Sequence, residues 1–143
     1  MREFRVKLTV ADRAALDAAF PLSRGSGDIG KRAIEIVKIY FQAQDPGCAF
    51  VEPPKGGDLA VRASGAADPT IYEVKGTTDN GLAWQQLKVS SAHSHALLTN
   101  GRASVLRVTD VYGVEPVVYE MRHGEHFVLV PEPRWSFKAV HEA

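Results

Sequence analysis

The stretch that decides the fold is residues 57–76, which read GDLAVRASGAADPTIYEVKG. Two apolar-rich runs, residues 57–62 and 70–76, flank residues 63–69, which are small and polar residues and a proline typical of a turn. Because alternate residues of a strand face the same side, the polar residues of the second run gather on one face. The stretch therefore predicts a β-hairpin.

Outward from the hairpin, hydrophobic periodicity predicts the other elements. Residues 28–44 carry an apolar stripe at helical spacing behind Asp28, which predicts a helix capped by that residue. Ser90 or Ser91 is a suitable cap for a second helix that ends before Asn100. A short helix is expected over residues 11–20, and further strands over residues 3–10, 48–51, 105–112, 117–121 and 127–130. Residues 82–89 are ambiguous between strand and helix, and a strand is preferred because the serines after them suit the start of a helix.

The predicted order of the central elements is one helix, three strands, one helix and one strand. This order is typical of an α/β protein in which a mixed sheet is flanked by helices. The length of 143 residues fits one domain, residues 1–143.

Composition excludes several classes of protein. The chain has 17 basic and 17 acidic residues, so it does not hold nucleic acid by bulk charge alone, although a local basic face stays possible. Its single cysteine, Cys48, excludes an internal disulfide and a cysteine-based zinc site. No run approaches the roughly 20 apolar residues that cross a bilayer, and the first residues lack a signal peptide's apolar run. We therefore expect a cytoplasmic protein with no membrane partner.

Three ionisable residues of the hairpin point to chemistry. Asp58 begins one strand, and Glu73 and Lys75 share a face of the next. Two carboxylates at one strand end repel each other unless a hard divalent cation such as Mg²⁺ lies between them. The alternative is an ordinary exposed hairpin with a cross-strand ion pair, which contributes under about 1 kcal/mol.

Asp58 followed by EVK at residues 73–75 resembles the motif of the PD-(D/E)XK nuclease superfamily, in which an acid begins one strand and acid-X-lysine follows on the next. Gly57 stands where that superfamily often has a proline. Within the superfamily, residues 73–77 (EVKGT) and 105–112 (VLRVTDVY) are similar to the DUF3883 type of domain, which occurs at the ends of larger bacterial defence and helicase proteins.

The resemblance covers about residues 28–121, a nuclease-like core. The glutamate usual on the following helix of that type is absent, and His93 stands nearest. The resemblance implies a restriction-endonuclease-like mixed β-sheet flanked by helices. It also implies a nuclease that hydrolyses DNA phosphodiester bonds with Mg²⁺, or with Mn²⁺ in its place.

The same resemblance implies roles for particular residues. Asp58, Glu73 and the backbone carbonyl of Val74 would hold the metal, and Lys75 would orient the attacking water. Glu35, on the predicted helix over residues 28–44, would reach the metal through a water. Gln85 or Gln86 would position Lys75 or contact the DNA backbone.

Other residues are weaker candidates for binding. The start of the helix over residues 28–44, with Lys31 and Arg32, is suited to a DNA phosphate. Further candidates for phosphate contacts are Lys88, Arg102, Arg107, Arg122 and Arg134. Trp84 and Trp135 are expected in the core or an interface.

Three functions stay open from the sequence. The first is a nuclease in bacterial defence or DNA processing, which needs a homodimer or a larger complex to cut both strands. The second is a catalytically inactive subunit of the same fold that binds nucleic acid or serves assembly, which the neutral net charge favours. The third is a protein-interaction module, which follows if the hairpin carries only an ion pair.

Overall fold

The computed structural model describes residues 1–22, 25–132 and 137–140. Three α-helices, one 3₁₀ helix and six strands follow one another in that part of the chain. They are β1 (Arg2–Arg5), α1 (Val10–Ala19), α2 (Ser26–Gln44), β2 (Ala49–Val51), β3 (Leu59–Arg62), β4 (Thr70–Gly76), the 3₁₀ helix η2 (Trp84–Gln86), α3 (Ala92–Thr99), β5 (Ala103–Thr109) and β6 (Val117–Met121).

The strands form one mixed sheet in the order β1-β6-β5-β4-β3-β2. The strands β2, β3 and β4 form an antiparallel meander, and the predicted hairpin is its second half, with Leu59 opposite Tyr72. β5 pairs parallel to β4, because α3 carries the chain back across the sheet between them. The predicted α/β class, a mixed sheet with helices, is confirmed.

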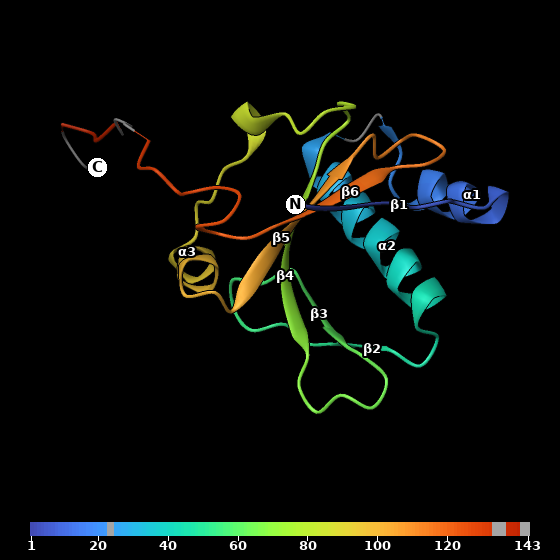
Figure 1. Cartoon of the computed structure of the whole chain (residues 1–143). Helices are drawn as coiled ribbons and strands as arrows, with labels where there is room; N and C mark the ends of the chain where they lie inside the picture. The colour runs from blue at the N-terminus through green and yellow to red at the C-terminus, as the bar shows by residue number, and fades with distance from the viewer. Residues whose placement is uncertain (23–24, 133–136, 141–143) are drawn as a thin grey trace.

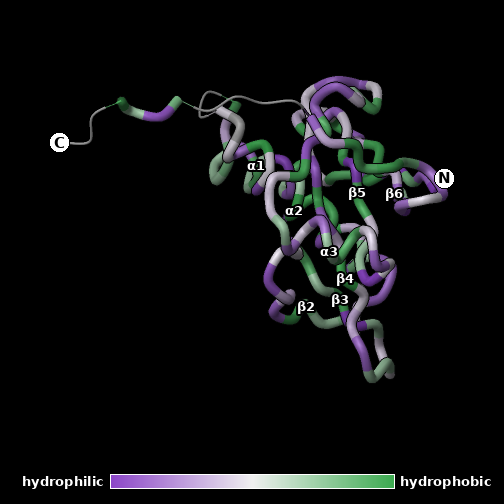
Figure 2. The backbone as a smooth tube through the Cα atoms, turned by 90° about the vertical axis from the view of Figure 1, so that its left-hand side faces the viewer, coloured by the Kyte–Doolittle hydropathy of each residue, from purple (hydrophilic) through white to green (hydrophobic). Residues whose placement is uncertain are grey.

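Helices cover both faces of the sheet (Figure 1). α2 packs its fully buried Ala33 and Ile36 against the face that carries Tyr72 and Val74. α3 packs Leu98 against the opposite face, which carries Ile71, Val105 and Met121. Figure 2 shows hydrophobic stretches along the central strands β3, β4 and β5. Alternation along β4 therefore sends Tyr72 and Val74 toward α2, and Glu73 and Lys75 toward α3.

The predicted N-cap residue is confirmed for α3 and is wrong for α2. Ser91 caps α3, since its hydroxyl accepts from the backbone N–H groups of His93 and Ser94. The predicted cap Asp28 is wrong: α2 begins two residues earlier, and its N-cap is Gly25 at φ 93°. Glycine adopts that backbone angle without steric cost. Asp28 lies in the first turn instead, where its charge suits the helix dipole.

Two predicted strands are wrong. Residues 82–89 contain the 3₁₀ helix, because the buried Arg107 guanidinium binds the carbonyls of Leu82 (2.8 Å) and Ala83 (3.3 Å) and bends the segment over the sheet end. Residues 127–130 form only an isolated bridge, between Phe127 and His123. Both segments lie over the α3 side of the sheet, where side-chain contacts replace strand pairing.

Two glycines let the helices approach the hairpin closely. A Cβ on Gly76 would lie 2.8 Å from the Cβ of Ala33, so α2 crosses β4 at a point where only glycine fits. A Cβ on Gly56 would lie 2.6 Å from the backbone carbonyl carbon of His93 and from the backbone nitrogen of Ser94, and Gly56 has φ 95°. The start of α2 is therefore held against the end of β4, and the start of α3 against the residues just before β3.

Among the described residues, no helix combines the length and the apolar character needed to cross a membrane.

Candidate functional site

An open cleft of about 630 Å³ lies between the start of α2 and the end of β4; we call it the α2–β4 cleft. It brings together most of the residues that the hairpin motif singles out. Its lining comprises Gly27, Ile29, Gly30, Lys31, Ile34, Asp58, Glu73, Val74, Lys75, Gly76, Thr77, Thr78 and Gln86.

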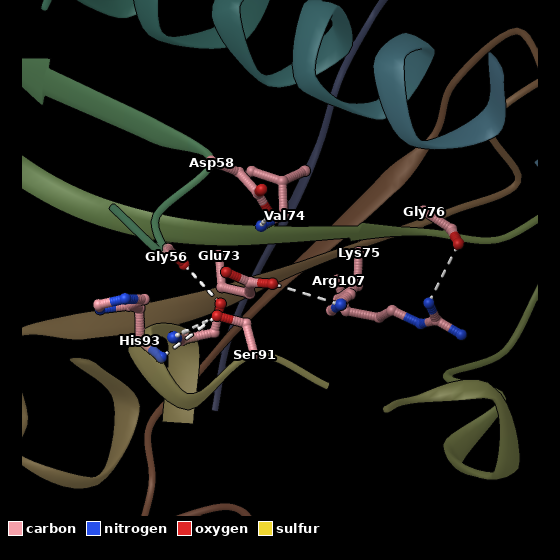
Figure 3. A network of polar contacts seen from close by, with 10 residues as sticks. Gly56, Asp58, Glu73, Val74, Lys75, Gly76, Ser91, His93 and Arg107 are labelled. Atoms are coloured by element: carbon pink, nitrogen blue, oxygen red, sulfur yellow. Dashed lines mark hydrogen bonds and ion pairs between the residues drawn. The ribbon is translucent and has the colours of Figure 1, made fainter. Parts of the chain in front are cut away.

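Asp58 stands just before β3 and is anchored to β4 at two points. Its backbone N–H donates to the Tyr72 carbonyl at 3.0 Å, and its Oδ2 accepts from the Val74 N–H at 2.8 Å. Figure 3 shows Asp58 beside Val74 on the α2 side of β4, whereas Glu73 and Lys75 lie on the other side of that strand. Oδ2 is thus engaged with the β4 backbone, and Asp58 approaches the edge of β4 from the face opposite Glu73.

Glu73 is a buried carboxylate with an incomplete set of partners. The residue is 6% exposed, and its Oε1 lies 3.3 Å from Nζ of Lys75. Oε2 has no hydrogen-bond partner among the described residues. The Ser94 hydroxyl donates to the Gly56 carbonyl at 2.7 Å. It also lies near the Glu73 carboxylate and lowers its pKa, but it forms no hydrogen bond with Oε2. Such an oxygen can accept a cation or a donor from a ligand.

The surroundings of Glu73 disfavour its charged form. Burial raises the pKa of Glu73 above its ordinary value of 4.5, and the charge of Asp58 raises it further. Lys75 acts in the opposite direction, because its ammonium group stabilises the carboxylate. The negative charge of Asp58 therefore acts on Glu73 across the edge of β4.

The backbone of Val74 faces the same edge. In a strand, the N–H and the C=O of one residue point toward the same neighbour. The Val74 N–H meets Asp58 rather than a β3 backbone carbonyl, since β3 begins only at Leu59. The Val74 carbonyl therefore points to the side of β4 that faces the residues just before β3.

The structure separates the two glutamines. Gln86 lines the α2–β4 cleft and binds Oγ1 of Thr77 at 2.8 Å and Asp79 at 3.1 Å. Gln85 is exposed and is not part of the cleft lining. Gln86 is therefore the glutamine that the fold brings to the cleft, through the 3₁₀ helix that periodicity did not predict.

Glu35 does not line the cleft. Its carboxylate lies 3.4 Å from Nζ of Lys38, one turn along α2. The cleft receives Lys31 and Ile34 from α2 instead, because those positions face the end of β4. No contact among the described residues links Glu35 to the other predicted site residues.

Two predicted phosphate contacts are wrong, because the guanidinium groups are buried. Arg32 is fully buried, binds the Val111 carbonyl at 2.7 Å and Asp17 at 2.8 Å, and stacks on Tyr112. Arg107 is 1% exposed and is occupied with backbone carbonyls.

The other basic residues predicted to contact phosphate lie in different surroundings. Lys88 pairs with Glu132, while Arg102 and Arg122 are exposed on the surface. Arg134 and Trp135 lie outside the described residues. Trp84 was expected in the core or an interface, yet it is 48% exposed, so a core position is wrong.

Sequence reasoning missed Ser94 and the threonines that follow β4. Ser94 joins α3 to Gly56, and Thr77 holds Gln86 in place. The polar pair Thr77-Thr78 directly after a strand was a signal for a functional edge. The role of Ser94 depends on the packing of α3, and no local pattern carries it.

Comparisons with protein-family models, with curated proteins and with solved structures give no match. Fold and site define a class all the same. It is a mixed α/β protein whose central meander carries two acids and a lysine at one strand edge.

Proposed function

We propose that the α2–β4 cleft hydrolyses DNA phosphodiester bonds with Mg²⁺, or with Mn²⁺ in its place. One observation carries the proposal: the buried Glu73 has an oxygen without a partner, beside Lys75 and within electrostatic reach of Asp58. The α-βββ-α-β order of α2 to β5, with β5 parallel to β4, also fits the restriction-endonuclease-like fold that the motif implies.

The residues of the cleft suit a hard divalent cation. Mg²⁺ takes oxygen ligands, usually one or two carboxylates, and keeps several waters. In this proposal Oε2 of Glu73, a carboxylate oxygen of Asp58 and the Val74 carbonyl would hold the cation at the edge of β4, which requires Asp58 to leave its contact with the Val74 N–H on the face opposite Glu73. A cation would also offset the repulsion and desolvation that raise the pKa of Glu73. No group of three or more His, Cys, Asp or Glu residues suited to a metal occurs in the described part of the chain, so waters would complete the coordination.

The protein's own residues have separate tasks in the proposed reaction. A bound Mg²⁺ supplies a water of lowered pKa and neutralises charge on the phosphate oxygens. Lys75 keeps donors of its ammonium group beyond the one directed at Glu73, so it orients the water and stabilises the same charge. The first turn of α2 and Lys31 border the cleft and hold a backbone phosphate through free N–H groups and charge. Glu35 and Gln85 are not part of this proposed set.

A second candidate function is a catalytically inactive nucleic-acid-binding or assembly subunit of the same fold. The hydrogen bond of Asp58 to the Val74 N–H favours it, because this contact holds Asp58 on the side of β4 away from Glu73. The neutral net charge is also consistent with a weak, local contact to DNA. Cleavage of both strands would require a homodimer or a larger defence or helicase complex.

Plasmid nicking separates the two functions. Purified protein is incubated with supercoiled plasmid and with single-stranded DNA in Mg²⁺, Mn²⁺ or EDTA, beside Asp58→Ala, Glu73→Gln and Lys75→Ala. We expect metal-dependent cleavage that each variant reduces by at least about 100-fold, as removal of a transition-state contact does. The matched control Glu52→Gln changes an exposed acid outside the cleft and should keep wild-type activity. Binding without cleavage would establish the inactive subunit instead.

A further inference from the structure

A second pocket, of about 270 Å³, opens on the α3 side of the sheet; we call it the apolar pocket. Its walls are mostly hydrophobic and come from β4, η2 and the segment after it, α3, β5, and the end of β6 with the chain that follows. They include Leu87, Val89, Leu98, Val105, Met121 and Phe127. Trp84 also lines it and keeps 48% of its surface exposed. The apolar pocket therefore combines hydrophobic walls with a half-exposed aromatic side chain.

The apolar pocket and the α2–β4 cleft meet at two residues. Glu73 and Lys75 line both, and all other lining residues belong to one cavity alone. One side of the acid–lysine pair is thus polar and open, with Lys31 and the start of α2. The other side is apolar, with Trp84 beside it. A phosphodiester group at Lys75 would have its neighbouring nucleoside within reach of the apolar pocket.

The shape and chemistry of the apolar pocket suit a nucleobase. Its volume lies near the lower limit of small-molecule sites, about 300 Å³, so it admits one ring system rather than a larger ligand. A base presents a flat π-face, which stacks on aromatic side chains, and a polar edge, which can reach the unsatisfied Oε2 of Glu73 or the ammonium group of Lys75.

Base pairing decides which nucleic acid can supply that base. In a duplex each base is stacked on its neighbours, so its face is accessible only after costly unstacking. In a single strand the bases splay out and stack on protein aromatic groups. We propose that the apolar pocket receives the base of an unpaired nucleotide, stacked on Trp84, so that the site acts on single-stranded DNA. This inference rests on the nuclease or DNA-binding function proposed for the adjoining cleft.

Binding of short oligonucleotides tests the inference separately from catalysis. Fluorescence anisotropy in EDTA compares a labelled single strand, the same strand in a duplex, and the strand with abasic sites. We expect tighter binding of the single strand. Trp84→Ala should weaken it by about 5- to 150-fold, the equivalent of one lost base stack, and Trp84→Phe should weaken it less. Phe137→Ala, which changes a fully exposed aromatic residue outside the pocket lining, should have no effect.

The abasic strand makes the test specific to stacking. Removal of bases should weaken binding to the wild type and have little effect on Trp84→Ala, because that variant has already lost the stack. Equal affinity for duplex and single strand, or equal losses in both proteins, would overturn the inference even if Mg²⁺-dependent nicking stands. Base-dependent binding through Trp84 without any cleavage would support the base pocket and reject the nuclease.

Discussion

Replacement of Glu73 by glutamine should abolish the proposed activity and at the same time stabilise the fold at neutral pH. Glutamine keeps the shape of the side chain but removes its charge. Glu73 is 6% exposed and has one oxygen without a partner, so its carboxylate is poorly compensated in the folded state. A residue that is retained for function at the expense of stability behaves in this way.

The size of the effect follows from two opposing contributions. A buried polar atom without a partner costs about 1–3 kcal/mol, and more when it is charged; glutamine keeps an unpaired atom at this place but removes the charge. The ion pair with Lys75, whose side chain is 31% exposed, returns under about 1 kcal/mol. A neutral amide is less costly to bury than a carboxylate. Glu73→Gln should therefore raise the free energy of unfolding by about 1 kcal/mol at pH 7, which corresponds to about 3 °C in Tm.

The gain should depend on pH with a definite sign. Below the ordinary value of 4.5, Glu73 is protonated in both folded and unfolded chains, so the carboxylate imposes no cost. As pH rises above 4.5, the unfolded chain releases this proton first, since burial raises the pKa of Glu73 in the folded state. The contribution of Glu73 to the free energy of unfolding of the wild type falls across that window, and it is constant above the pKa of Glu73 in the folded state. The advantage of Glu73→Gln should therefore grow from pH 4 to pH 7.

Urea unfolding followed by circular dichroism, at several pH values between 4 and 7, measures this difference. Glu52→Gln is the matched control, because Glu52 is exposed and its replacement should leave stability unchanged at every pH. A Glu73→Gln protein that is less stable than the wild type at pH 7 would refute the reasoning, as would a difference that does not vary with pH.

Two further predictions concern the contacts that position the cleft. Gly76→Ala would place a Cβ 2.8 Å from Ala33, so it should displace α2 and cost about 1–3 kcal/mol in urea unfolding, whereas Gly81→Ala, which meets nothing within 4 Å, should be tolerated. Equal unfolding midpoints for these two variants would disprove the close approach. Ser91→Ala removes the N-cap of α3 and should lower the free energy of unfolding by about 1 kcal/mol, while Ser90→Ala should change it little. A lower Tm for Ser90→Ala than for Ser91→Ala in thermal melts would show that Ser91 is not the cap.

Local patterns were sufficient for the elements that local chemistry controls. The alternation in residues 57–76 predicts the hairpin, and the helical stripe after residue 28 predicts most of α2. Ser91 caps its helix through its own neighbours in the sequence, so the sequence could narrow the cap to two serines. Alternation along β4 predicted that Glu73 and Lys75 share a face, whereas the side of β4 that Asp58 occupies depends on the hydrogen bond that it accepts from the Val74 N–H.

Contacts between distant segments decided the rest. Residues 82–89 have the composition of a strand, but Arg107, which is remote in sequence, occupies their carbonyls and bends them into η2. The same buried arginine, like Arg32, was expected on the surface because its burial depends on carbonyls that only the tertiary structure supplies.

The sequence by itself determined the central hairpin and the two flanking helices. Only the tertiary structure decided that Gln86 rather than Gln85 reaches the cleft, that Glu35 faces Lys38, and that the apolar pocket adjoins Glu73. The physical reason is the distance along the chain over which each interaction acts. Periodicity and capping act within a few residues, whereas burial and the partners of a charged group depend on which distant segments pack against it.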